Sequence, residues 1–140
     1  MIVKDIMQTD VTTVGANDSL HIAEDLMTLG HLRHLPVIVG DHRLVGLVTE
    51  RDLEPFVSAE VGGLIKGAEL KTIPVRMVMR CGVATARPGE RLSEALQLMI
   101  DNQIGCLPVV DGDKLAGLLT QADCLRAFAE LLDSSERVVH

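Results

Sequence analysis

Apolar residues between positions 19 and 29 recur every three or four residues, which is the period of an amphipathic helix. The residues on this apolar face are Leu20, Ala23 and Met27. Asp18 or Ser19 can cap the start of the helix with a side-chain oxygen, and Gly30 can end it. The pattern therefore predicts a helix over residues 19–29.

The pattern then changes to short β-rich runs. LPVIV at 35–39 and RLVGLV at 43–48 lie on either side of a Gly-Asp turn signal, which is typical of a β-hairpin. The extended segment VTTV at 11–14 precedes the helix, and a second helix over residues 50–58 is expected to start at Thr49. Together these segments predict the order β-α-β-β-α.

The whole pattern occurs twice. The second copy lies 72 residues further along the chain, and one deletion reduces the shift to 71 in its last part. The matching segments are VKDIM (3–7) and VRMVM (75–79), VTTV (11–14) and VATA (83–86), LPVIV (35–39) and LPVVD (107–111), and LVGLVTERD (44–52) and LAGLLTQAD (115–123); the second helical face is Leu92, Ala95, Leu96 and Met99. We expect a first repeat at residues 1–58, a linker at 59–72, a second repeat at 73–132 and a polar tail at 133–140.

One β-α-β-β-α unit is too small to cover both faces of its own sheet. We therefore expect an α/β (α+β) fold in which the two repeats pack sheet to sheet with quasi two-fold symmetry. Such packing would leave two equivalent clefts, one for each repeat.

Composition narrows the class of protein. The chain has 140 residues, of which 47% are hydrophobic and 24% charged, as in a globular protein. Phe56 and Phe128 are the only aromatic residues, so the core is aliphatic and a ligand base has no Tyr or Trp to stack on. The net charge is −7 and no basic run is present, which disfavours nucleic-acid binding.

Cys81, Cys106 and Cys124 form an odd set without C-x-x-C spacing, which is typical of reduced thiols in a cytoplasmic protein. The sequence has no signal-peptide pattern and no apolar run of the ~20 residues that a membrane helix needs. We expect Cys106 and Cys124 to be buried as small apolar residues. His31 and His34 predict no metal site, because no carboxylate or thiol at ligand spacing completes the set.

Both copies contain Gly-x-x-Thr-x-x-Asp, as GLVTERD at 46–52 and GLLTQAD at 117–123. One interpretation is structural, since a Thr at a helix N-cap and an acid three residues later resemble a capping box. The other is functional: free N–H groups and the positive dipole end of the helix attract phosphate, and the carboxylate suits ribose hydroxyls. Gly46 and Gly117 either permit a close backbone approach or mark a bend in the strand.

The repeated strands and the paired motif resemble a pair of cystathionine β-synthase (CBS) domains, the tandem unit also called a Bateman module, over about residues 1–132. The resemblance implies β-α-β-β-α repeats packed through their sheets, a disc formed by two modules, and regulatory adenosine ligands such as AMP, ADP, ATP or S-adenosylmethionine. The residues that it implies for ligand binding are Thr49, Asp52, Thr120 and Asp123 at the phosphate and ribose, and Thr13, Val14, Pro36, Val37, Thr85, Ala86, Pro108 and Val109 at the adenine.

We therefore expect a stand-alone regulatory module, not an enzyme, that binds an adenosine ligand in the inter-repeat clefts and signals to a partner protein by conformational change. The alternative is a ligand-free homodimeric scaffold. Catalysis through Cys81 or a histidine is disfavoured because no nucleophile–base pair is visible. The helices over 19–29 and 50–58, with their second-repeat equivalents, are expected to form the dimer interface, which exposure of Phe56 or Phe128 would support.

The two repeats differ in charge near the motif. Arg33 lies three residues before Pro36, where the family resemblance implies a basic residue that reaches the ligand of the other repeat; the alternative role is a surface salt bridge. We predict that the Thr120/Asp123 cleft binds its ligand more tightly, and that Arg33→Ala weakens nucleotide binding in calorimetry. Unchanged binding would remove Arg33 from the site.

Overall fold

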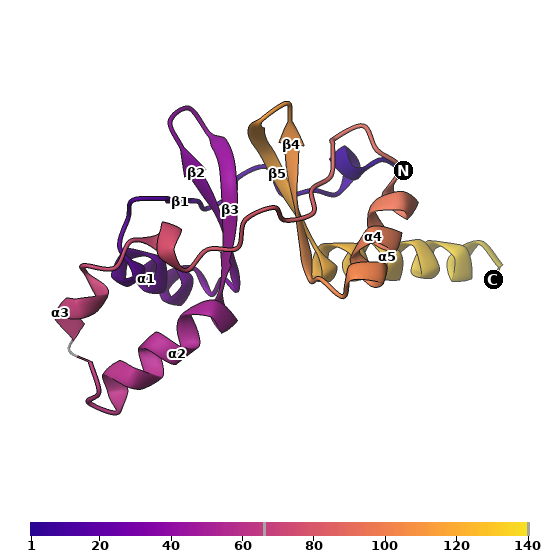
Figure 1. The fold of residues 1–140 in the computed structure, drawn as a ribbon. Helices are drawn as coiled ribbons and strands as arrows, with labels where there is room; N and C mark the ends of the chain where they lie inside the picture. Colours follow the sequence, from indigo (N-terminus) through magenta and orange to yellow (C-terminus); the bar gives the residue numbers. More distant parts are fainter. Residues whose placement is uncertain (66, 140) are drawn as a thin grey trace. The chain divides into compact units, whose positions relative to one another are not determined.

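The computed structural model describes residues 1–65 and 67–139 and divides into two compact units (Figure 1). The first-repeat unit is Thr12–Val83. The second-repeat unit combines Met1–Val11 with the chain from Ala84 onward. Each unit has its own cluster of buried apolar residues.

The first-repeat unit is built on three strands and two main helices. Its elements are β1 (Val14–Gly15), α1 (Leu20–Gly30), β2 (His34–Val39), β3 (Arg43–Thr49), α2 (Glu50–Val61), the short α3 (Gly67–Leu70) and the 3-10 helix η2 (Val75–Met77). β1 pairs with β2 in parallel, and β2 pairs with β3 as an antiparallel hairpin. Leu20, Ala23 and Met27, the predicted apolar face of α1, are buried in the core of this unit.

The second-repeat unit repeats this order. Its elements are the 3-10 helix η1 (Val3–Asp5), α4 (Leu92–Asn102), β4 (Cys106–Asp111), β5 (Lys114–Thr120) and α5 (Gln121–Val139). A parallel bridge between Ala86 and Val109 occupies the place of β1, and β4 pairs with β5 as an antiparallel hairpin. The predicted α/β fold with two β-α-β-β-α repeats is therefore confirmed.

Each unit is completed by the segment that leads into the other repeat. Val3 is fully buried in the second-repeat core, where its N–H donates to the Glu90 carbonyl at 2.9 Å. Val75, its equivalent, is fully buried in the first-repeat core and donates to the Asp18 carbonyl at 2.7 Å. The compact units therefore do not coincide with the two copies of the sequence pattern.

The ends of α1 correct one prediction and decide another. Ser19 is the N-cap and its Oγ accepts from the Ile22 N–H at 3.3 Å, whereas Asp18 accepts from the Gly15 N–H instead. Gly30 was expected to end the helix but is its last helical residue. The left-handed C-cap is His31, with φ of 51°. Gln103 takes the same left-handed conformation after α4. In both repeats the helix C-cap is therefore a residue other than glycine.

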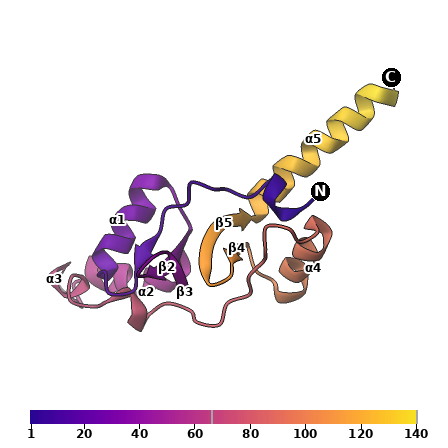
Figure 2. The ribbon, with the colours of Figure 1, turned by 90° about the horizontal axis from the view of Figure 1, so that it is seen from above.

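Two helices extend beyond their predicted ends. α2 continues to Val61 and α3 follows it, within the segment predicted as a linker. α5 continues to Val139, through residues predicted as a tail, and in Figure 2 its last turns extend away from α4 and the β4–β5 hairpin. The exposed apolar residues of α5 include Leu125, Phe128 and Leu132, which have the i, i+3, i+7 spacing of one face of an amphipathic helix.

Cys106 and Cys124 are buried, as the sequence predicted, and Cys81 is exposed. Burial raises the pKa of the Cys106 thiol to about 12, so it stays protonated at neutral pH. Among the helices of residues 1–65 and 67–139, none combines the length and the apolarity needed to cross a membrane.

The motif glycines sit where a neighbouring segment passes very close. Arg80 exchanges two backbone hydrogen bonds with Leu47, and Gln8 exchanges two with Leu118. A Cβ on Gly46 would lie 2.8 Å from the Arg80 carbonyl oxygen, and one on Gly117 would lie 2.6 Å from the Gln8 carbonyl oxygen. Close backbone approach is therefore the reason for glycine here.

We predict that Gly46→Ala and Gly117→Ala each lower the free energy of unfolding by about 1–3 kcal/mol, because the new methyl group overpacks against backbone that is held by two hydrogen bonds. Chemical denaturation would measure the loss. Gly89→Ala is the matched control, since a Cβ there meets no atom within 4 Å. Equal stability of all three variants would contradict the close-approach explanation.

Candidate functional site

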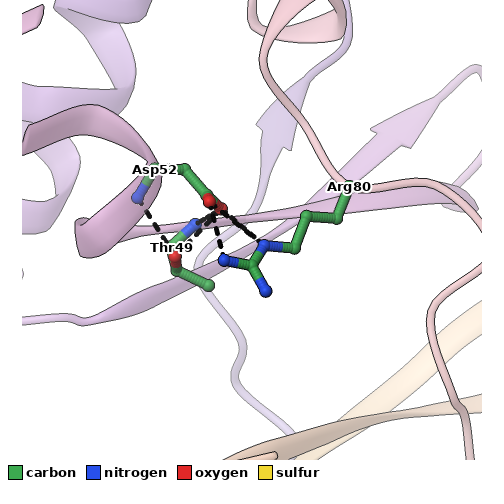
Figure 3. Close-up of polar contacts among 3 residues, drawn as sticks. All are labelled: Thr49, Asp52 and Arg80. Carbon is green, nitrogen blue, oxygen red and sulfur yellow. Dashed lines mark hydrogen bonds and ion pairs between the residues drawn. The ribbon is translucent and has the colours of Figure 1, made fainter. Parts of the chain in front are cut away.

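The Thr–Asp pair of the first repeat forms a closed set of hydrogen bonds at the start of α2. The Thr49 hydroxyl and N–H donate to Asp52 Oδ2 at 2.9 and 3.0 Å, and the Asp52 N–H donates to Thr49 Oγ1 at 3.3 Å (Figure 3). This is the predicted capping box. The pair therefore orients the first turn of α2 and satisfies the N–H groups of Thr49 and Asp52, while the Glu50 N–H donates to the Arg33 carbonyl. The positive end of the helix dipole lies at this turn.

The second repeat reproduces this geometry at the start of α5. The Thr120 hydroxyl and N–H donate to Asp123 Oδ2 at 2.7 and 3.3 Å, and the Asp123 N–H donates to Thr120 Oγ1 at 3.2 Å. The side chains of Asp52 and Asp123 are 14% and 11% exposed. Each unit thus presents a Thr hydroxyl and a largely buried carboxylate beside a helix N-terminus.

A guanidinium covers the carboxylate of the first-repeat unit. Arg80 Nε donates to both oxygens of Asp52 at 3.0 and 3.2 Å, and its Nη2 donates to Oδ1 at 2.9 Å. Figure 3 shows the Arg80 side chain reaching across to the capping box from outside the motif. Arg80 is placed there by its backbone bridge to Leu47 on β3.

Different side chains hold the equivalent carboxylate of the second-repeat unit. Gln8 Nε2 donates to Asp123 Oδ2 at 2.9 Å, from a backbone bridge to Leu118 that matches the one at Arg80. Arg126, one turn further along α5, donates from Nη2 to Asp123 Oδ1 at 2.7 Å. In this unit the residue equivalent to Arg80 is the neutral Gln8, and the positive charge beside Asp123 is the Arg126 guanidinium on α5.

Both carboxylates remain ionised because their partners outweigh their burial. Burial raises the pKa of Asp52, but the hydrogen bonds from Arg80 and Thr49 together lower it by more. The pKa of Asp52 therefore lies below its ordinary value. Burial also raises the pKa of Asp123, and hydrogen bonds from Thr120, Gln8 and Arg126 again lower it below the ordinary value. Each site therefore offers an acceptor for hydroxyl groups at neutral pH.

The predicted adenine-contact segments lie side by side in each unit. Val14 pairs with Val37, directly after Thr13 and Pro36, and Ala86 pairs with Val109 in the same way, directly after Thr85 and Pro108. Val14, Pro36, Val37, Ala86, Pro108 and Val109 are buried, whereas Thr13 and Thr85 are half-buried. A ligand role for the buried residues thus falls on their backbone groups rather than on their side chains.

Arg33 lies beside the first-repeat motif through its backbone. Its carbonyl accepts from the Glu50 N–H at 2.9 Å, and its side chain is exposed. Within the described part of the chain its guanidinium has no salt bridge, so the surface ion pair considered as an alternative is not observed. Its reach toward a ligand stays a prediction.

Sequence reasoning missed three side chains of these sites. Gln8 and Arg80 occupy equivalent positions directly after the matched segments VKDIM and VRMVM, so the repeat alignment contained a signal for them. Arg126 lies three residues after Asp123, the spacing of helix neighbours, and could have been paired with it. The leading segments were treated as parts of their own repeats, which hid these contacts.

The helix pairs differ in the character of their grooves. Between α4 and α5 lies an apolar groove of about 510 Å³, whose lining includes Met99, Leu125 and Phe128. The groove between α1 and α2 is smaller, about 220 Å³, and its lining includes three carboxylates, Glu24, Glu50 and Glu54.

Comparison with known sequences identifies the repeats. The family model of the CBS domain matches residues 3–57 and 75–130. The CBS domain-containing protein YhcV of Bacillus subtilis is 35% identical over 121 residues, which are 86% of this chain and 81% of that protein. Homoserine O-acetyltransferase of Methanohalobium evestigatum is 33% identical over 129 residues, which are 91% of this chain but only 24% of the enzyme. The chain thus spans about a quarter of that relative.

Solved structures agree with this assignment. A putative acetoin utilization protein (AcuB) of Vibrio cholerae has a TM-score of 0.83 at 29% identity, covering 98% of this chain and 96% of that one. CBSX2, an Arabidopsis thaliana protein, in complex with AMP has a TM-score of 0.79 at 28% identity, covering 93% and 97%. The CBS domain pair of protein MJ0100, in complex with 5′-methylthioadenosine and S-adenosyl-L-methionine, has a TM-score of 0.78 at 25% identity, again covering 93% and 97%. The chain therefore belongs to the CBS domain family and contains two CBS domains in tandem.

Proposed function

We propose that this CBS pair is a regulatory module that binds an adenosine ligand, such as AMP or S-adenosylmethionine, at the Thr–Asp sites of its two repeats. The observation that carries the proposal is the paired geometry itself: in both units a Thr hydroxyl and an ionised, largely buried carboxylate stand at the start of a helix. AMP, 5′-methylthioadenosine and S-adenosyl-L-methionine bound to structurally similar CBS pairs support the ligand class.

Each group has a physical role in this proposal. The phosphate of a nucleotide would bind at the N-terminus of α2 or α5, where the positive end of the helix dipole favours an anion. The Thr49 or Thr120 hydroxyl would donate to it by turning away from Asp52 or Asp123, to which it donates in this structure. The ribose hydroxyls would donate to Asp52 or Asp123, which have only acceptor atoms when ionised. The adenine would lie against backbone groups of the segments at residues 13–14 and 36–37, or their equivalents, because no aromatic platform is present.

The output of such a module is a change in conformation rather than a chemical reaction. CBS pairs are regulatory and non-catalytic modules, and the raised pKa of the buried Cys106 keeps that thiol from acting as a nucleophile. A ligand shifts a conformational equilibrium only by its difference in affinity between two states, so a partner protein would read the state that the ligand favours.

A thermal-shift series tests this proposal. AMP and S-adenosylmethionine should raise the melting temperature of the wild-type chain, because a ligand at 100 times its dissociation constant adds about 2.7 kcal/mol to the stability of the folded state. Asp52→Ala and Asp123→Ala should each remove the part of the shift that comes from their own site, and the double variant should remove all of it. Wild-type protein that neither gains stability from any adenosine ligand nor releases one on denaturation would favour a ligand-free scaffold.

A second proposal concerns self-association, and it rests on the face formed by α4 and α5. The large exposed apolar side chains of this face include Ile100, Leu125, Phe128, Leu131 and Leu132. All of these except Leu132 line the 510 Å³ groove. Exposed apolar side chains gathered on one face mark an interaction site. A stable dimer buries roughly 800 Å² on each partner.

Charge favours a second copy of this same face as the occupant. The α1–α2 face carries Glu24, Glu50 and Glu54 around its groove, and burial together with Glu60 raises the pKa of Glu24. Two such acidic faces would repel each other, whereas two α4–α5 faces are apolar and complementary under a two-fold axis. Phe56, the other aromatic residue, packs against the first-repeat core and is half-buried.

Phe128→Glu should convert a dimer to a monomer in sedimentation equilibrium, because it places a charge in the centre of the apolar face. Leu29→Glu is the control, since Leu29 is 82% exposed but lies on α1. It should leave the mass unchanged. A Phe128→Glu protein with the wild-type mass, or dissociation by Leu29→Glu, would exclude this face as the interface.

A further inference from the structure

The two Thr–Asp sites have the same backbone but differ in the charge of one equivalent side chain. Gln8 and Arg80 each come directly after one of the matched segments VKDIM and VRMVM. Gln8 exchanges two backbone hydrogen bonds with Leu118, and Arg80 exchanges two with Leu47. From this common position Gln8 donates one hydrogen bond to Asp123, and Arg80 donates three to Asp52. The repeat thus contains a natural comparison of a cation and a neutral amide at one place.

Arg80 occupies the atoms that a ribose would need. It bonds both oxygens of Asp52 at 2.9 to 3.2 Å, and the Thr49 hydroxyl and N–H take further acceptor positions on Oδ2. Hydroxyl groups of a ligand can reach this carboxylate only if the guanidinium moves away. The Arg80 side chain is 56% exposed, so it is free to turn while its backbone stays fixed.

We propose that Arg80 makes the first-repeat site selective for adenosine ligands that carry a phosphate, because its guanidinium blocks Asp52 until an anion at the start of α2 draws it away. This inference rests on the proposed function. A phosphate offers the guanidinium a new charge-assisted, bidentate partner, so exchange of the carboxylate for the phosphate costs little. An uncharged nucleoside offers none, so its binding must break the Arg80–Asp52 pair without replacement.

The second-repeat site lacks this device. Gln8 is neutral and makes a single hydrogen bond to Asp123, so a ribose hydroxyl can replace it at small cost. Arg126 does contact Asp123, but through one nitrogen and one oxygen, from a position further along the same helix. The first-repeat residue equivalent to Arg126 is Pro55, which carries no charge. Each carboxylate is thus contacted by one arginine, Arg80 or Arg126, but only Arg80 bonds both carboxylate oxygens. We therefore expect this site to distinguish weakly between nucleosides and nucleotides.

Calorimetry with AMP and with adenosine, which differ only in the phosphate, tests the inference. In an Asp123→Ala background, which leaves the first-repeat site alone, Arg80→Gln should weaken AMP binding about tenfold and strengthen adenosine binding about fivefold. The opposite signs are the decisive feature, because a purely structural role for Arg80 would move both affinities in the same direction. In an Asp52→Ala background, Gln8→Arg should raise the preference of the second-repeat site for AMP.

Arg76→Gln is the matched control, because it removes the same charge from the same leading segment while Arg76 contacts Asn17 rather than Asp52. It should leave both affinities unchanged. If wild-type protein binds AMP but Arg80→Gln behaves like Arg76→Gln, or weakens both ligands equally, the role of Arg80 is wrong and the proposed function stands. If the wild type binds neither AMP nor adenosine, the role of Arg80 is also wrong, and the proposed function is then decided by S-adenosylmethionine in the thermal-shift series.

Discussion

The structure depends on two short segments that each complete a unit from outside its helices and hairpin. Val3 and Val75 are fully buried, and the backbone around them is held by matched hydrogen bonds to the chain before α4 and α1. The same segments continue to Gln8 and Arg80, whose bridges to the motif strands require the glycines at 46 and 117. Burial of two valines thus determines which side chains reach the two carboxylates.

The low exposure of Asp52 and Asp123 explains why each carboxylate has a hydrogen-bond donor in addition to its capping Thr. A largely buried charge is costly unless hydrogen-bonded or paired, so Asp52 and Asp123 each need donors beyond their capping Thr. The first repeat meets this need with Arg80, and the second meets it with Gln8 and Arg126. Duplication therefore preserved the requirement while the residues that satisfy it diverged. Such divergence lets two sites of one backbone geometry present different charges to a ligand.

Local signals predicted most of the fold. The apolar face of α1, both hairpins and the capping boxes depend on residues within a few positions of one another, and the structure confirms them. The repeat alignment identified equivalent segments, but it contains no information on which unit a leading segment joins. For that reason the sequence did not indicate that Arg80 would meet Asp52, 28 residues away, or that Gln8 would meet Asp123, 115 residues away. The His31 cap was missed because glycine is the usual residue for a left-handed helix end.

The division of the chain into units also determines the order in which they can fold during synthesis. The first-repeat unit is one continuous stretch, so all its parts exist once residue 83 has been made. Residues 1–11 are made before the first-repeat unit, yet their packing partners begin only at Ala84. This segment, which includes Val3, therefore has no core to join until the second repeat has been made. Folding of the second-repeat unit consequently joins two segments that flank the first-repeat unit, a contact of high sequence separation that forms late.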